Sequence, residues 1–238
     1  AIAKAAGYSD EDAKLLAWSD METDYTLQVK AWNCLWSNLG LYYHFWPGNP
    51  KDLICRRASE LSKRIMDYAY NCGEIPVLGI ALHGLQDTYS HQEWVGKFSR
   101  HNVLPTWSKD KFTPSLPFPY GHSPMGKTPD IATATWYDPR TNQQIVNVDR
   151  VIWALDATSV ALGGNRISRI WDDIAKVFLR TPEYEARKEA LRNLAGMSSL
   201  HFSEIRQDMF RKHRVPFIQA ARAQAQIVRT YLSEIKTS

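Results

Sequence analysis

This chain of 238 residues has little cysteine, and it lacks the sequence motifs of several common catalytic and metal sites. The three cysteines, Cys34, Cys55 and Cys72, show no C-x-x-C spacing, which argues against a disulfide framework or a cysteine zinc site and predicts buried small side chains. No apolar run approaches the roughly 18 to 20 residues of a membrane-spanning helix. A Gly-rich phosphate loop, a G-x-S-x-G turn and an H-E-x-x-H motif are also missing, so nothing local favours a serine or cysteine nucleophile.

What remains is the composition of a folded globular protein, with 44% hydrophobic and 23% charged residues. Nine Trp and eleven Tyr are many for this length, and such large rings need a core or an apolar pocket to pack against. The net charge of +4 suits phosphate-bearing partners or a membrane surface, and it is equally typical of a solvated surface. The sequence does not open with the basic segment and apolar run of a leader peptide, and it starts within a predicted helix. We therefore expect the chain to be a piece trimmed from a longer protein.

Helical periodicity dominates the sequence on both sides of a loop-rich middle. The capping box that begins at Ser9 predicts a helix to about Asp24, and Pro76 starts the most apolar helix, which runs to about Trp94. Residues 27–45 favour a helix or a break near Gly40, and spacings of three and four predict a helix over 51–72. Further helices are predicted at about 149–162, 166–179, 182–196 and 202–236, the last kinked at Pro216.

Residues from about 95 to 147 carry seven Pro and little periodicity, which predicts a long loop region with one short hairpin near 134–148. Loops of this length inside a domain are often functional. The predicted fold class is all-α, with residues 1–238 forming a single metal-binding helical domain and this Pro/Gly-rich loop region inserted after its central helix.

Three polar residues interrupt the apolar helix at a regular spacing. His83, Asp87 and His91 lie at i, i+4 and i+8, so all three project from one helix face. Two imidazoles and a carboxylate are ligand types that zinc prefers, and an unpaired buried carboxylate would be costly. A hydrogen-bonded His-Asp-His network that stabilises the core is the alternative interpretation.

Other metal-ligand side chains stand where a fold could bring them close. His44 ends an aromatic stretch, His122 and Asp130 stand in turns of the long loop, and Asp24 shares a face of the first helix with Asp20. Taken singly, each is more typical of a surface or capping residue than of a ligand. Glu93, just beyond the three spaced residues, is either a catalytic base or a solvated rim charge.

The segment Leu82-His83-Gly84-Leu85-Gln86-Asp87-Thr88-Tyr89-Ser90-His91 resembles the superfamily of zinc-dependent phospholipases C and single-strand nucleases, closest to a less characterised bacterial branch. The resemblance covers roughly residues 1–136. Its matching positions are the metal ligands Asp24, His44, His83, Asp87, His91, His122 and Asp130, together with Asn102. It implies an all-helical fold and a zinc site of one to three ions, with other divalent metals as alternatives.

The resemblance also implies the hydrolysis of a phosphate ester. The predicted catalytic residues are Asp87, which belongs to the matching segment, and Glu93, which stands just beyond it. Trp46, Trp94 and Asn102 are the predicted substrate-binding residues, although core packing explains each tryptophan equally well. The expected substrate is a lipid or a nucleic acid, and a membrane surface is an expected partner. A secreted bacterial toxin or effector is an expected setting, with an immunity or carrier protein as its partner.

Three other functions compete with a phospholipase C-like hydrolase. A nuclease would use the same metal site beside a basic groove and stacking aromatic rings. A metal-stabilised, non-catalytic binding protein would instead close its ion off from water. An amidase or peptidase has only the generic metal site in its favour.

Overall fold

The computed structural model describes residues 2–27, 38–97, 99–102, 120–122, 128–131, 134–138, 140–163 and 202–234. Within them the protein is mostly helical, with one two-stranded sheet, so the prediction of an all-α fold is wrong in that respect. The elements are α1 (Ile2–Ala5), α2 (Asp10–Thr26), α3 (Leu39–Tyr43), α4 (Glu60–Cys72), α5 (Ile75–Ser90), the 3-10 helices η1 (Arg100–Asn102) and η3 (Thr128–Asp130), β1 (Thr135–Asp138), β2 (Gln143–Val146), α6 (Asn147–Ala161) and α9 (Phe202–Ser233).

Helix α2 starts at its predicted cap, whereas α4 starts later than predicted. Ser9 is the N-cap of α2, and its Oγ accepts the Asp12 backbone N–H at 3.0 Å, as the capping box predicts. The helix predicted over 51–72 begins only at Glu60, because Leu53 and Ala58 adopt left-handed φ angles of 58° and 52° that no α-helix can include. The helices predicted at 166–179 and 182–196 lie outside the described residues.

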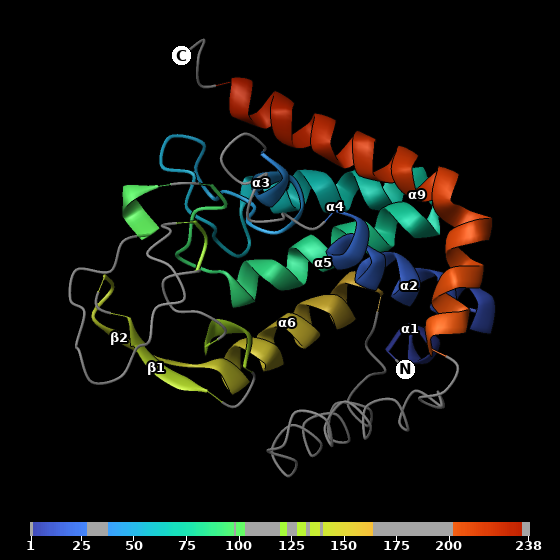
Figure 1. Cartoon of the computed structure of the whole chain (residues 1–238), viewed down its shortest axis with the longest axis horizontal. Helices are drawn as coiled ribbons and strands as arrows, with labels where there is room; N and C mark the ends of the chain where they lie inside the picture. Colours follow the sequence, from blue (N-terminus) through green and yellow to red (C-terminus); the bar gives the residue numbers. More distant parts are fainter. Residues whose placement is uncertain are drawn as a thin grey trace.

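Helix α5 is the centre of the fold. It packs against α2, α3, α4, α6 and α9, and Figure 1 shows it between α9 on one side and α6 on the other. Eleven of its sixteen residues are buried. A helix that is apolar nearly all round belongs in the interior, so the polar side chains that it carries must find partners there.

Two glycines let neighbouring groups approach the α5 backbone closely. A Cβ at Gly79 would stand 2.5 Å from Ser19 Cβ and 2.8 Å from Leu16 O, so α2 crosses α5 at this point. A Cβ at Gly84 would overlap the indole of Trp46, which is fully buried. Both contacts depend on the missing side chain and set how α2 and the end of α3 lie on α5.

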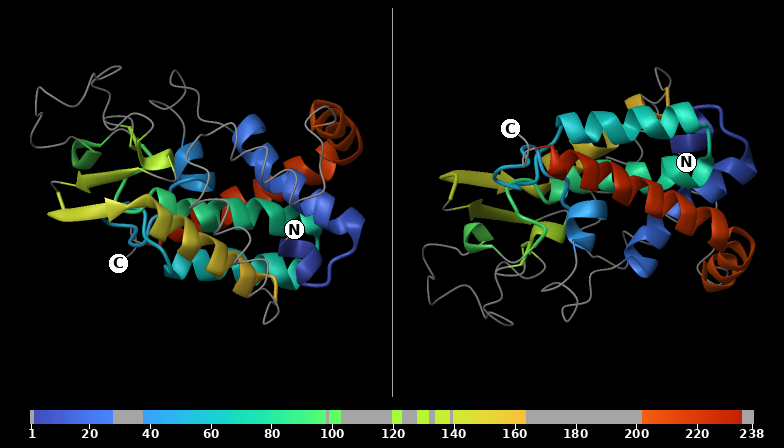
Figure 2. Two further views of the ribbon diagram at one scale, coloured as in Figure 1. Left: turned by 90° about the horizontal axis from the view of Figure 1, so that it is seen from below. Right: turned by 90° about the horizontal axis from the view of Figure 1, so that it is seen from above.

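A hairpin forms one end of the molecule, as predicted near 134–148. β1 and β2 pair antiparallel from Thr135↔Val146 to Asp138↔Gln143, and β2 leads directly into α6. Both views of Figure 2 show the hairpin beyond the end of the helical bundle. Its Trp136 packs with Phe45, Cys55 and Trp94 in a small second core.

The last helix, α9, runs through Pro216 without a break, and it changes direction along its length (Figure 1). Arg206 joins it to α2 through the fully buried Glu22, with Nε and one terminal nitrogen 2.7 and 2.9 Å from the carboxylate oxygens. Among the helices in the described ranges, none combines the length and the apolar character needed to cross a membrane.

The close contact at Gly84 is open to test. We expect Gly84→Ala to lower the free energy of unfolding by about 1–3 kcal/mol, because the added methyl group overlaps a fully buried indole. Urea denaturation measures the change. Combining it with Trp46→Phe should give a smaller loss than the sum of the two single losses, and simple additivity would contradict direct contact.

Candidate metal centre

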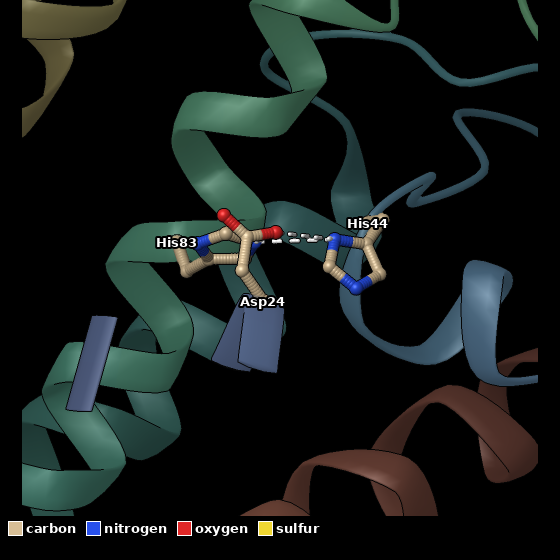
Figure 3. A group of neighbouring side chains, drawn as sticks. All are labelled: Asp24, His44 and His83. Carbon is tan, nitrogen blue, oxygen red and sulfur yellow. Dashed lines mark hydrogen bonds and ion pairs between the residues drawn. The ribbon is translucent and has the colours of Figure 1, made fainter. Parts of the chain in front are cut away.

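Three separate segments bring a carboxylate and two imidazoles to one point. Asp24 stands near the end of α2, His44 is the residue that ends α3, and His83 lies in the middle of α5. Figure 3 shows Asp24 and His83 facing the ring of His44. Asp24, His44 and His83 each offer one ligand atom, and these atoms lie within 4.8 Å of one another.

The spacing of these atoms suits a small dication. His83 Nε2 lies 3.1 Å from His44 Nδ1 and 3.5 Å from Asp24 Oδ1, and His44 Nδ1 lies 3.9 Å from Asp24 Oδ1. Two ligands bound at about 2.0–2.1 Å around a tetrahedral zinc ion are about 3.4 Å apart, so only small adjustments separate this arrangement from a coordination shell.

Asp87 completes the cluster from one turn further along α5. Its Oδ2 lies 2.9 Å from His44 Nδ1, 3.3 Å from His83 Nε2 and 3.7 Å from His91 Nδ1. Burial alone would raise the pKa of Asp87, but the imidazoles of His91, His83 and His44 outweigh it and hold that pKa well below its usual range. The carboxylate is therefore ionised and ready to accept a cation.

The same balance acts on His83. Burial disfavours its charged form, but Asp87 and Asp20 outweigh burial and raise the pKa of the imidazole well above its ordinary value. The raised pKa favours the charged imidazole when no metal ion is bound. A bound dication would have to displace that proton.

One nitrogen of His44 also fits a ligand role. Nδ1 faces the cluster, whereas Nε2 is buried and has no hydrogen-bond partner among the described residues. A ring held by two hydrogen bonds would be an ordinary structural histidine. Here the ring is fixed mainly through the nitrogen that points at Asp87, His83 and Asp24.

His91 and His122 form a second group beside Asp87. His91 caps the C-terminal end of α5, and its Nδ1 lies 3.1 Å from the backbone oxygen of His44. Its ring stacks on Phe45, with 4.3 Å between ring centroids, and also lies against the ring of His122 at 4.9 Å. The Gly121 N–H donates to Val95 O at 3.1 Å, which attaches the turn 120–122, and with it His122, to the segment that follows α5.

The cluster opens into a pocket of about 430 Å³ between α2, α5 and α6. Asp24 forms part of its rim, with 64% of its side chain exposed, whereas the side chains of His83 and Asp87 are 8% and 17% exposed. The lining consists of Ala17, Asp20, Met21, Asp24, His83, Gln86, Asp87, Ser90, Val151, Ala154 and Leu155. A small molecule can therefore reach the cluster from solvent.

The structure thus brings six of the seven predicted ligands into two adjoining groups, and Asp130 is placed only by its backbone in η3. His91 belongs to the end of α5 and not to its face, because the helix stops at Ser90 and not near Trp94. Glu93, a predicted catalytic residue, has a left-handed φ of 70°, and its side chain pairs with Arg56 at 3.3 Å. The Glu93 carboxylate therefore forms its ion pair with Arg56 and not with a residue of the cluster.

The three predicted substrate-binding residues need correction, since each is fully buried. Trp46 packs on Gly84, and Trp94 lies in the second core. Asn102 bonds the backbone N–H and C=O of Val95 at 2.9 Å each, so it holds the chain after α5. These side chains build the scaffold around the site and do not line its pocket.

A salt bridge supports the chain just beyond His91. Arg140 binds the buried Asp138, with 2.6 Å between one terminal nitrogen and Oδ2, and also donates to the backbone oxygen of Glu93. Its guanidinium lies 3.7 Å from the centre of the Trp94 ring. The hairpin is thereby fixed to the segment that follows α5.

A family model described as a family of unknown function (DUF6765) matches residues 36–232. This range includes His44, His83, Asp87, His91 and His122, and it begins after Asp24. No curated protein and no solved structure matches the chain.

The Asp138–Arg140 bridge gives a prediction with a defined pH dependence. Burial raises the pKa of Asp138, but its bonds to Arg140 outweigh burial and lower that pKa. Its contribution to stability is therefore present above the unfolded pKa of about 3.9 and is lost as the pH falls through the lower, folded value. Asp138→Asn should cost about 3–5 kcal/mol at pH 7, and the difference from wild type should shrink in acid.

Chemical denaturation of both proteins between pH 3 and pH 7 measures this difference. Asp67→Asn is the matched control, since Asp67 is exposed and pairs only at the surface of α4 with Lys63, so its effect should stay within about 0.5 kcal/mol. A loss for Asp138→Asn that stays constant down to pH 3 would exclude the ion pair as its source.

Proposed function

We propose that this chain, which belongs to the family of unknown function DUF6765, is a metal-dependent hydrolase of phosphate esters, similar to a phospholipase C. The observation that carries the proposal is a His/Asp cluster with metal-ligand spacing that opens into a pocket. Structural metal sites are usually closed by four protein ligands, whereas catalytic sites keep a position for water or substrate. An open cluster therefore favours catalysis over the metal-stabilised, non-catalytic binding protein.

The residues that would hold the ion are Asp24, His44, His83 and Asp87, and zinc suits this mixture of nitrogen and oxygen ligands. His91 and His122, next to Asp87, would serve further ions. Bound dications of this kind lower the pKa of a coordinated water and stabilise negative charge on a phosphoryl oxygen.

The chain's own side chains bind and orient the substrate around this centre. Gln86 and Ser90 bring polar groups to the pocket on the α5 side, next to Asp87. Met21 on α2 and Val151 and Leu155 on α6 form apolar walls opposite them. Such walls exclude water from one side of the cluster and suit an aliphatic group attached to the ester.

The charge of the lining favours a lipid-like ester over a nucleic acid. Among the described residues that line the pocket there is no Lys, no Arg and no aromatic ring other than the imidazole of His83. Binding of a nucleic acid strand requires basic groups along its phosphates and rings on which its bases stack. A nuclease is therefore the weaker of the two candidate functions.

Metal analysis of the purified protein is the first test. We expect zinc in the wild-type protein, measured by inductively coupled plasma mass spectrometry, and loss of that zinc together with phosphodiesterase activity in His83→Ala. His213→Ala is the matched control, because His213 lies on α9 beside Trp18 and outside the cluster. Wild-type protein that takes up no zinc, or His83→Ala that keeps its full zinc content, would refute the assignment.

The apolar wall gives a second test, aimed at the substrate. Leu155→Ala should raise the KM for a phosphodiester bearing a long alkyl chain by about 10-fold and leave that for its methyl counterpart nearly unchanged. Val160→Ala on the exposed side of the same helix is the control. Equal effects on both substrates would show that the wall does not contact the alkyl group, and selective cleavage of single-stranded DNA would favour the nuclease.

A further inference from the structure

Asp20 lies directly behind one of the proposed ligands. Its Oδ1 stands 3.0 Å from His83 Nδ1, on the opposite side of the ring from Nε2, which faces His44, Asp24 and Asp87. A carboxylate only accepts hydrogen bonds, so Nδ1 must carry the hydrogen and donate it. In the neutral ring this leaves the lone pair on Nε2, the nitrogen that faces the cluster.

The carboxylate of Asp20 is itself held in place. Gln86 Nε2 donates to Asp20 Oδ2 at 3.3 Å, and Gln86 follows His83 by three residues, on the same side of α5. Asp20 belongs to α2, and the hydrogen bonds from His83 and Gln86 thus join it to α5.

The crossing of the two helices makes this contact available. A Cβ at Gly79 would stand 3.2 Å from the Asp20 backbone nitrogen, so the α2 backbone at Asp20 lies against α5 one turn before His83. Asp24 follows Asp20 by one turn of α2 and lies on the same helix face. The close approach of α2 to α5 at Gly79 therefore places Asp20 behind His83 and Asp24 in front of it.

We propose that Asp20, held by Gln86, is the positioning residue that fixes the tautomer and orientation of His83 for metal binding. The inference rests on the proposed function, since it assigns a role towards the same metal centre. A histidine ligand whose other nitrogen donates to a carboxylate is a better and more rigid ligand, and removing such a partner commonly weakens metal affinity by about 10- to 100-fold. Asp20 acts through His83 and does not itself contact the ion.

Zinc affinity, measured by competition with a chromophoric chelator, tests this role. We expect Asp20→Asn to bind the same number of zinc ions with about 10- to 100-fold weaker affinity, because it removes the charge behind His83 and keeps the shape. Asp67→Asn on α4, which removes an exposed carboxylate, should bind zinc as tightly as the wild-type protein. Loss of one ion in Asp20→Ala would make Asp20 a ligand and overturn the proposal, and so would unchanged affinity in Asp20→Asn.

A second measurement needs no metal. Nitrogen-15 spectra of the histidine rings in the metal-free protein, at a pH high enough to deprotonate the His83 ring, should show His83 as the Nδ1–H tautomer, and Asp20→Ala should populate the Nε2–H tautomer. An unchanged tautomer would refute the role of Asp20. Because this readout is independent of zinc, a wild-type protein that binds no zinc would defeat the proposed function and still leave the role of Asp20 decided.

Discussion

The largely buried carboxylate of Asp87 among three imidazoles is the interaction on which the site depends. An ionised carboxylate inside a helical core costs several kcal/mol unless cations or hydrogen bonds offset the loss of water. Here His44, His83 and His91 surround it, and each of them comes to Asp87 from a different place in the chain or a different turn of α5. One carboxylate thus joins the residue that ends α3, the middle of α5 and the residue that ends α5.

That arrangement would not form on an ordinary helix. Helix α5 is buried over most of its surface, and its glycines at 79 and 84 admit the backbone of α2 and the indole of Trp46 at distances that a side chain would prevent. The first contact brings Asp20 and Asp24 to His83, and the second fixes the chain just after His44. The close packing at Gly79 and Gly84 therefore also positions the side chains of the cluster.

The openness of the cluster is the feature that favours the proposed catalytic site over a closed structural metal site. Asp24 stays largely in solvent at the rim of the pocket, whereas His83 and Asp87 lie beneath it, so a bound ion would keep access to water and substrate. The apolar side of the pocket comes from α6, which follows the hairpin directly. The hairpin in turn is tied to the end of α5 through Arg140, so the wall and the ligands share one support.

The sequence alone determined much of the local structure. The cap at Ser9, the apolar period of α5, the hairpin near 134–148 and the spacing of His83 and Asp87 follow from interactions within a few residues, and the structure agrees with each. It could not determine that Trp46, Trp94 and Asn102 are buried, or that Asp20 lies behind His83. Those outcomes depend on which helices approach each other and how closely, and such distances are set by packing between residues that are dozens of positions apart in the chain.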